Sequence, residues 1–141
     1  MIFGTDRNQL RKAYADAWKK FQQKQTLTPL EQQITDVIKE HPEYHKNLTE
    51  LEADFLPEMG QTNPFLHMGM HLGLREQLTT NRPAGIRGCF QALIDKLQSS
   101  HEAEHQMMEC LAEAMWIAQR QGTMPDEEAY LNCLKKRAGL L

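Results

Sequence analysis

Paired histidines are the feature of this sequence that is best suited to chemistry. All six histidines fall in three pairs with a four-residue spacing, namely His41/His45 in HPEYH, His67/His71 in HMGMH and His101/His105 in HEAEH. Random placement would give about 0.2 such pairs. Four residues is just over one helical turn, so the two side chains of a pair point the same way on a helix. Neutral imidazole is a common metal ligand, and the pattern therefore indicates a metal site.

Carboxylates near the third pair extend the predicted ligand set. The first-choice ligands are His67, His71, His101 and His105, and the set is completed by His41, His45, Glu104 and Glu109. Mixed histidine and glutamate clusters on facing helices hold zinc, iron or manganese in bundle proteins. The Glu102–His105 spacing is similar to that of di-iron bundles, and the His105–Glu109 spacing resembles hemerythrin-like proteins, although neither full ligand set is present. With an open ligand position, metal-assisted hydrolysis or oxygen chemistry becomes feasible, but the reaction stays undetermined.

Three other interpretations use the same residues. HEAEH matches the HExxH helix of zinc proteases, with Glu102 as general base, but it starts its helix and no strand is predicted to hold a peptide. Alternatively, helix N-termini attract anions, and Arg75, Arg82 and Arg87 could add positive charge. This second interpretation predicts a non-enzymatic interaction or anion-binding protein that needs no metal. The simplest interpretation is that the histidines are hydrogen-bonded structural groups.

Helix signals dominate the chain and predict an all-α fold. Capping boxes begin at Thr28 and Ser99, Asn63 precedes a proline, and Gly122 follows a long apolar pattern. Helices are expected after Asp6, at 29–41, at 64–79, at 84–98, at 100–121 and from Pro125, with a long loop at 49–62. The simplest arrangement is an antiparallel, up-down bundle of four long helices with additional short ones.

Topology gives a reason for the histidine pairs to converge. Short connections make successive helices antiparallel. The pair at 41 and 45 follows a downward helix, whereas the other two pairs lie at the starts of upward helices. All three pairs are then expected at one end of the bundle, which the 49–62 loop also crosses.

Composition limits the class of protein. The 141 residues predict a single domain over 1–141, with 40% hydrophobic and 25% charged residues and a net charge of −3. Neither a nucleic acid nor a membrane is expected as partner, and a small molecule or a protein is. The first residues lack the layout of a secretory signal. Cys89, Cys110 and Cys133 are widely spaced, so we expect buried, reduced thiols in a cytoplasmic protein.

Long blocks of the chain resemble a known family. The stretches NPFLHMGMHL and EHQMMECLAEAMW, together with TPLEQQITDVIKEHPEYH and NRPAGIRG, are similar to a family of small bacterial proteins known only as a domain of unknown function. The resemblance covers nearly the whole chain. It implies a bacterial cytoplasmic protein whose histidine-bearing segments belong to the family pattern, and it implies no activity.

Overall fold

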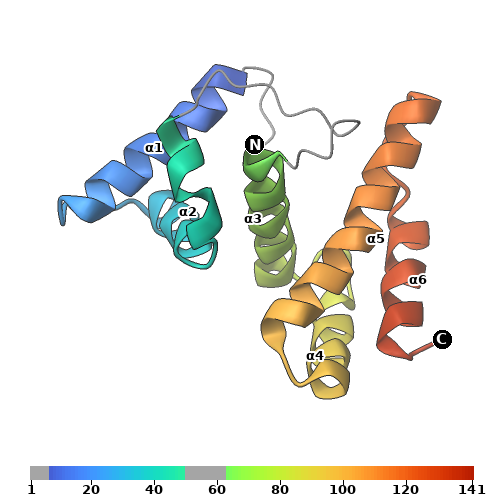
Figure 1. The fold of residues 1–141 in the computed structure, drawn as a ribbon. Helices are drawn as coiled ribbons and strands as arrows, with labels where there is room; N and C mark the ends of the chain where they lie inside the picture. Colours follow the sequence, from blue (N-terminus) through green and yellow to red (C-terminus); the bar gives the residue numbers. More distant parts are fainter. Residues whose placement is uncertain (1–6, 50–62) are drawn as a thin grey trace. The chain divides into compact units, whose positions relative to one another are not determined.

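Helices make up the regular structure of this chain in a computed structural model that describes residues 7–49 and 63–141 (Figure 1). The elements are α1 (Arg7–Gln22), α2 (Pro29–Lys39), the 3-10 helix η1 (Pro42–Thr49), α3 (Pro64–Thr80), α4 (Ile86–Leu97), α5 (Ser100–Gln121) and α6 (Glu127–Ala138). Within these ranges there is no strand, which confirms the all-α prediction. Asp6 and all of the predicted 49–62 loop except its first residue lie outside the described residues.

The chain divides into two compact units, Met1–Leu72 and Gly73–Leu141, and each is described by itself. The boundary falls inside α3, whose first half belongs to the first unit and whose second half belongs to the second. The four-helix bundle and the single domain over 1–141 remain predictions.

The first unit is built from α1, α2, η1 and the start of α3. Helix α2 begins where the sequence predicts, because the Thr28 hydroxyl accepts from the Glu31 N–H and the Glu31 carboxylate accepts from the Thr28 N–H. Pro42 follows the end of α2, and the chain continues as η1. The core shared by these elements consists of Tyr14, Ala17, Ile34, Val37, Ile38, Leu48, Phe65, Met68 and Leu72.

The second unit contains the rest of α3 with α4, α5 and α6, and these last three helices contact one another. Ser99 caps α5, since its hydroxyl accepts from the Glu102 N–H, and Gly122 ends α5 in the left-handed conformation with φ of +64°. Asp126 caps α6 in the same way as Ser99 caps α5. The predicted start and end of α5 are thereby confirmed, with the Ser99 half of the predicted capping box.

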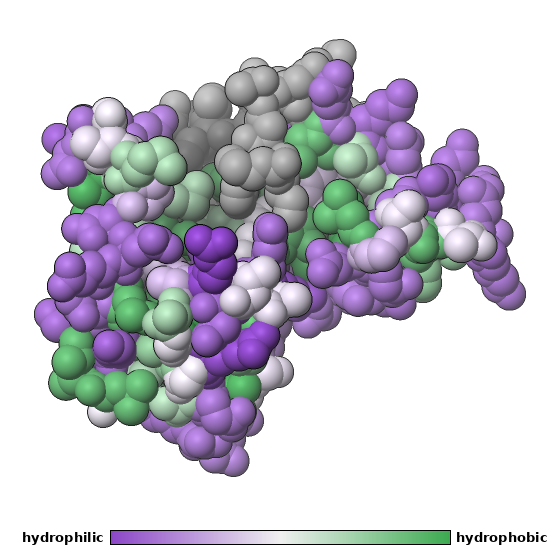
Figure 2. Space-filling view, turned by 180° about the vertical axis from the view of Figure 1, so that it is seen from behind, coloured by the Kyte–Doolittle hydropathy of each residue, from purple (hydrophilic) through white to green (hydrophobic). Residues whose placement is uncertain are grey.

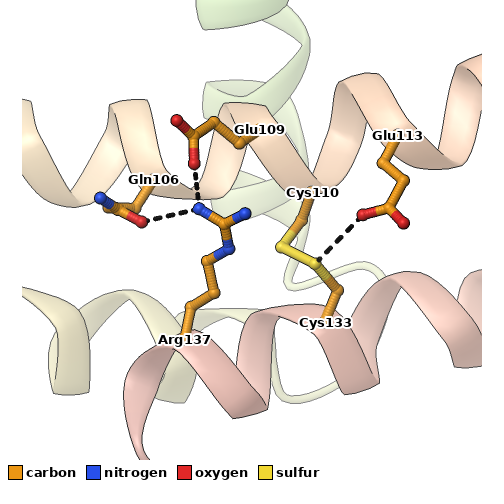
Figure 3. Close-up of a disulfide and its surroundings, with 6 residues drawn as sticks. All are labelled: Gln106, Glu109, Cys110, Glu113, Cys133 and Arg137. Carbon is orange, nitrogen blue, oxygen red and sulfur yellow. Dashed lines mark hydrogen bonds and ion pairs between the residues drawn. A yellow bond between two sulfur atoms is a disulfide. The ribbon is translucent and has the colours of Figure 1, made fainter.

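The prediction of three reduced cysteines is wrong for two of them. Cys110 of α5 and Cys133 of α6 form a disulfide with their Cα atoms 5.9 Å apart (Figure 3). The two cysteines are 23 residues apart, and only the antiparallel packing of α5 on α6 brings them together. Sequence spacing alone therefore did not predict this disulfide. Cys89 is a buried free thiol, as expected. The cytoplasmic location, which rested partly on reduced thiols, stays a prediction.

Some large apolar residues are on the surface. Leu30, Leu66 and Trp116 are each about half exposed or more. Hydrophilic side chains cover much of the face seen in Figure 2, with separate apolar groups between them. Among the described residues, no helix combines the length and apolar character that crossing a bilayer requires.

Candidate metal centre

Three histidines of the first unit form a compact cluster. His67 and His71 project from α3, and His41 follows the end of α2. One ring nitrogen of each lies within 4.8 Å of the corresponding nitrogens of the other two. His71 is completely buried and His41 is 3% exposed, whereas His67 is partly exposed. Burying three imidazoles together costs free energy unless their polar atoms are satisfied, so the arrangement favours a shared ligand or a hydrogen-bonded network.

The pair on α3 has the geometry that a helix imposes on a four-residue spacing. Asn63 caps this helix, because its side-chain oxygen accepts from the N–H groups of Phe65 and Leu66. The Nε2 atoms of His67 and His71 lie 3.2 Å apart. Two ligands of a tetrahedral zinc ion at about 2.0–2.1 Å are separated by about 3.3 Å. The distance between the two nitrogens is therefore compatible with binding to one ion, and without metal one ring can donate to the other.

His41 is oriented by the backbone of α2. Its Nδ1 lies 2.8 Å from the Val37 carbonyl oxygen, so Nδ1 carries the hydrogen and donates. The second nitrogen, Nε2, is buried and is then the basic atom. A histidine that binds metal usually donates its other N–H to a carbonyl or carboxylate, which fixes the ring and its tautomer. The hydrogen bond from His41 to the Val37 carbonyl is therefore of the kind that orients a metal-binding histidine.

Tyr44 forms part of the wall of this cluster and was missed by the sequence analysis. Its ring stacks on His41 with centroids 5.4 Å apart and contacts His67 edge-on at 5.8 Å. Burial, and to a smaller extent the charge of Glu43, raise the pKa of the Tyr44 phenol, which stays protonated as a hydrogen-bond donor. The sequence feature that could have indicated this role is the position of Tyr44 within HPEYH, three residues after His41.

His45 has different contacts from His41, although the two are four residues apart. Its Nε2 is 3.0 Å from the Ile38 carbonyl oxygen, and its ring packs on Trp18 with centroids 4.8 Å apart. The same-face rule holds only in a continuous α-helix. Helix α2 ends at Lys39, so both histidines lie beyond it, and Pro42 begins η1 between them. His45 does not belong to the histidine cluster found among the described residues.

In the second unit, the third histidine pair keeps its helical geometry. The rings of His101 and His105, near the start of α5, meet edge to face at 73°, with centroids 4.2 Å apart. His101 is exposed and His105 is partly buried. Both glutamates of the predicted ligand set bind arginines instead. Glu104 accepts from Arg75 Nε at 3.0 Å, and Glu109 accepts from Arg137 (Figure 3).

Two of the three arginines proposed for an anion site are already engaged. Arg75 binds Glu104, and Arg87 Nε donates to the Leu78 carbonyl oxygen at 2.6 Å near the end of α3. Arg82 is exposed. The described residues therefore provide less positive charge for an anion than the sequence suggested.

Fold and cluster together define a small all-helical protein with three histidines gathered around one point. The family described as a domain of unknown function, DUF1841, matches residues 6–136, and the chain belongs to this family. This match confirms the resemblance to an uncharacterised family. Neither the curated proteins nor the solved structures contain a match to this chain.

Proposed function

We propose that this protein binds one transition-metal ion through His41, His67 and His71. The observation that carries the proposal is the gathering of three ring nitrogens within 4.8 Å, with the His41 ring held by a backbone carbonyl. The ligands are neutral, so the charge of the ion is offset only by the surrounding dipoles. Imidazole donors suit zinc and iron(II) better than manganese, which prefers oxygen ligands.

His105 is our proposed fourth ligand, and its inclusion rests on the predicted convergence of the histidine pairs at one end of a bundle. A fourth histidine would give a closed structural site, whereas a water in that position would give an open site capable of hydrolysis.

Metal analysis of protein purified without an affinity tag tests the proposal. We expect close to one zinc or iron per chain. In competition with a chromophoric chelator, His71→Ala should weaken zinc binding by at least about a hundredfold. Losing a residue that only hydrogen-bonds to a ligand already costs about 10- to 100-fold in affinity, and losing the ligand itself costs more. His45→Ala is the matched control, since that ring contacts Trp18 and should leave zinc affinity unchanged.

Cobalt(II) substitution tests the geometry, because a tetrahedral site gives intense visible absorption bands that an octahedral aqua ion lacks. Loss or shift of these bands in His105→Ala would support the closed site, and unchanged bands would support water in the fourth place. Circular dichroism of each variant separates lost ligation from lost folding. Absence of metal in the wild type, with no change in zinc titration for His67→Ala/His71→Ala, would overturn the proposal.

The competing anion-binding function responds to pH in the opposite sense. Metal binding needs neutral imidazoles and weakens below about pH 6.5, whereas anion binding by imidazolium strengthens. Thermal shifts with zinc and with phosphate, measured at about pH 5.5 and about pH 7.5, separate the two. Stabilisation by phosphate that is greatest at the lower pH and insensitive to chelator would replace the metal proposal.

A further inference from the structure

The Cys110–Cys133 disulfide lies beside open space on the second unit. A cavity of about 220 Å³ between α5 and α6 is lined by both cysteines and by residues of the intervening turn, including Thr123 and Met124. Cys110 is 1% exposed, whereas Cys133 is partly exposed. The two cysteines therefore differ in exposure, and Cys133 is the more accessible of the two.

A second depression distinguishes the two sulfurs further. It has a volume of about 450 Å³ and is lined by Cys133, Lys136, Arg137 and Glu113, but not by Cys110. A thiolate attacks a disulfide sulfur along the S–S axis, from the side opposite the leaving sulfur. Open space that borders Cys133 and excludes Cys110 suits attack on Cys133 with Cys110 as the leaving group.

Charges around Cys133 select the kind of thiol. Arg137 is already engaged, since it donates to both Gln106 and Glu109 (Figure 3). Among the described residues that line this depression, Lys136 in the last turn of α6 is an exposed cation that can attract an anionic molecule. Glu113 Oε2 lies 4.0 Å from Cys133 Sγ. A disulfide sulfur has no proton to donate, so this approach becomes a hydrogen bond only after reduction, and until then the carboxylate repels a thiolate.

We propose that Cys133 is a site of thiol–disulfide exchange with an anionic low-molecular-weight thiol. The thiolate attacks Cys133 Sγ, the S–S bond breaks, and Cys110 leaves as a thiolate that takes up a proton. A mixed disulfide remains on Cys133. A second thiol attacks the sulfur of the bound small molecule, which leaves as a symmetric disulfide, and Cys133 becomes a thiol that donates to Glu113. Two thiols are oxidised for each protein disulfide reduced.

Glutathione, as the anionic probe, and cysteamine, as the cationic probe, test this site on the folded full chain. Intact mass and peptide mapping follow the mixed disulfide with time. We expect adducts on Cys133 and not on Cys110, with Cys89 unmodified because it is buried. Lys136→Gln should slow glutathione about two- to fivefold without slowing cysteamine, as for loss of one exposed charge contact. Glu113→Gln should accelerate glutathione by a similar factor, and Lys12→Gln on α1 is the charge-matched control.

Variants that lack one cysteine of the disulfide provide a second, independent measurement. In Cys110→Ser, the remaining Cys133 thiol should form a mixed disulfide with oxidised glutathione, whereas in Cys133→Ser the buried Cys110 should stay unmodified. Adducts on Cys110 in the wild type would overturn the proposal. A reduction rate that is independent of thiol concentration would also overturn it, because it would show that unfolding and not the open surface controls access.

Discussion

The contact between Arg75 and Glu104 changes the role that the sequence suggested for Glu104. Their side chains are 25% and 9% exposed, and the Arg75 Nε and Glu104 Oε1 atoms are 3.0 Å apart. Glu104 is thus an ion-pair partner in this structure, whereas its spacing from His101 and His105 suggested a metal ligand. The arginine lies 29 residues away in the chain, and a contact at that separation leaves no trace in local spacing.

Removing one charge of this pair should be costly. We expect Glu104→Gln to lower the free energy of unfolding by about 2 kcal/mol, because Arg75 then keeps its charge in a largely buried place without its partner. This value is smaller than for a fully buried pair, because solvent partly screens the Arg75 charge. Glu109→Gln is the matched control, since Glu109 is 60% exposed beside its own arginine and should cost less than about 1 kcal/mol. Urea unfolding measures both, and equal losses would contradict the importance of burial.

The histidines show which part of a site local spacing can predict. His67 and His71 lie on one uninterrupted α-helix, so their four-residue spacing was sufficient to place their nitrogens together. His41 and His45 have the same spacing, but Pro42 separates them and only His41 joins the cluster. The contribution of Tyr44 depends on how η1 packs on α3, which is a tertiary property that sequence spacing does not encode.

At the scale of elements, helix starts were predictable because their signals are local. The stretch Thr28-Pro29-Leu30-Glu31 contains every atom of its own capping box. Burial was less predictable: α3 is apolar nearly all round, a pattern typical of a central helix, yet Leu66 is 50% exposed. Which side of such a helix is covered depends on its neighbours, and the division of α3 between two units is not visible in its composition.

The cap of α2 makes the stability of the first unit sensitive to acid. The Glu31 carboxylate accepts from Lys20 at 2.8 Å and from the Thr28 N–H at 2.9 Å, and these bonds lower the pKa of Glu31. A carboxyl group whose pKa is lower in the folded state stabilises that state at pH values above its unfolded-state pKa, which is near 4.3. This stabilisation is lost as the pH falls through the folded-state pKa. We expect Glu31→Gln to flatten the decrease in melting temperature below about pH 5. An unchanged slope, relative to wild type, would show that the cap does not act through its charge.

At the scale of the molecule, the disulfide closes a chain segment between residues separated by 23 positions. Loop-closure entropy for such a segment corresponds to about 3 kcal/mol. We expect Cys110→Ser/Cys133→Ser to lower the free energy of unfolding by about this amount under oxidising conditions. Reduction of the wild type should produce a similar loss, and a reducing agent should leave the double variant unaffected. A double variant as stable as oxidised wild type would show that packing of α5 on α6 is sufficient.

The turn between α5 and α6 lies inside this covalent loop, and Met124 within it is 85% exposed. A protease that cuts the turn therefore cannot release α6, because the sulfur bridge still joins the two fragments. The nicked chain would migrate at its full mass on a gel without reductant and would separate into a large and a small fragment when reductant is added. Limited proteolysis therefore reports whether this disulfide is intact, and it can do so in cell extracts without purification of the protein.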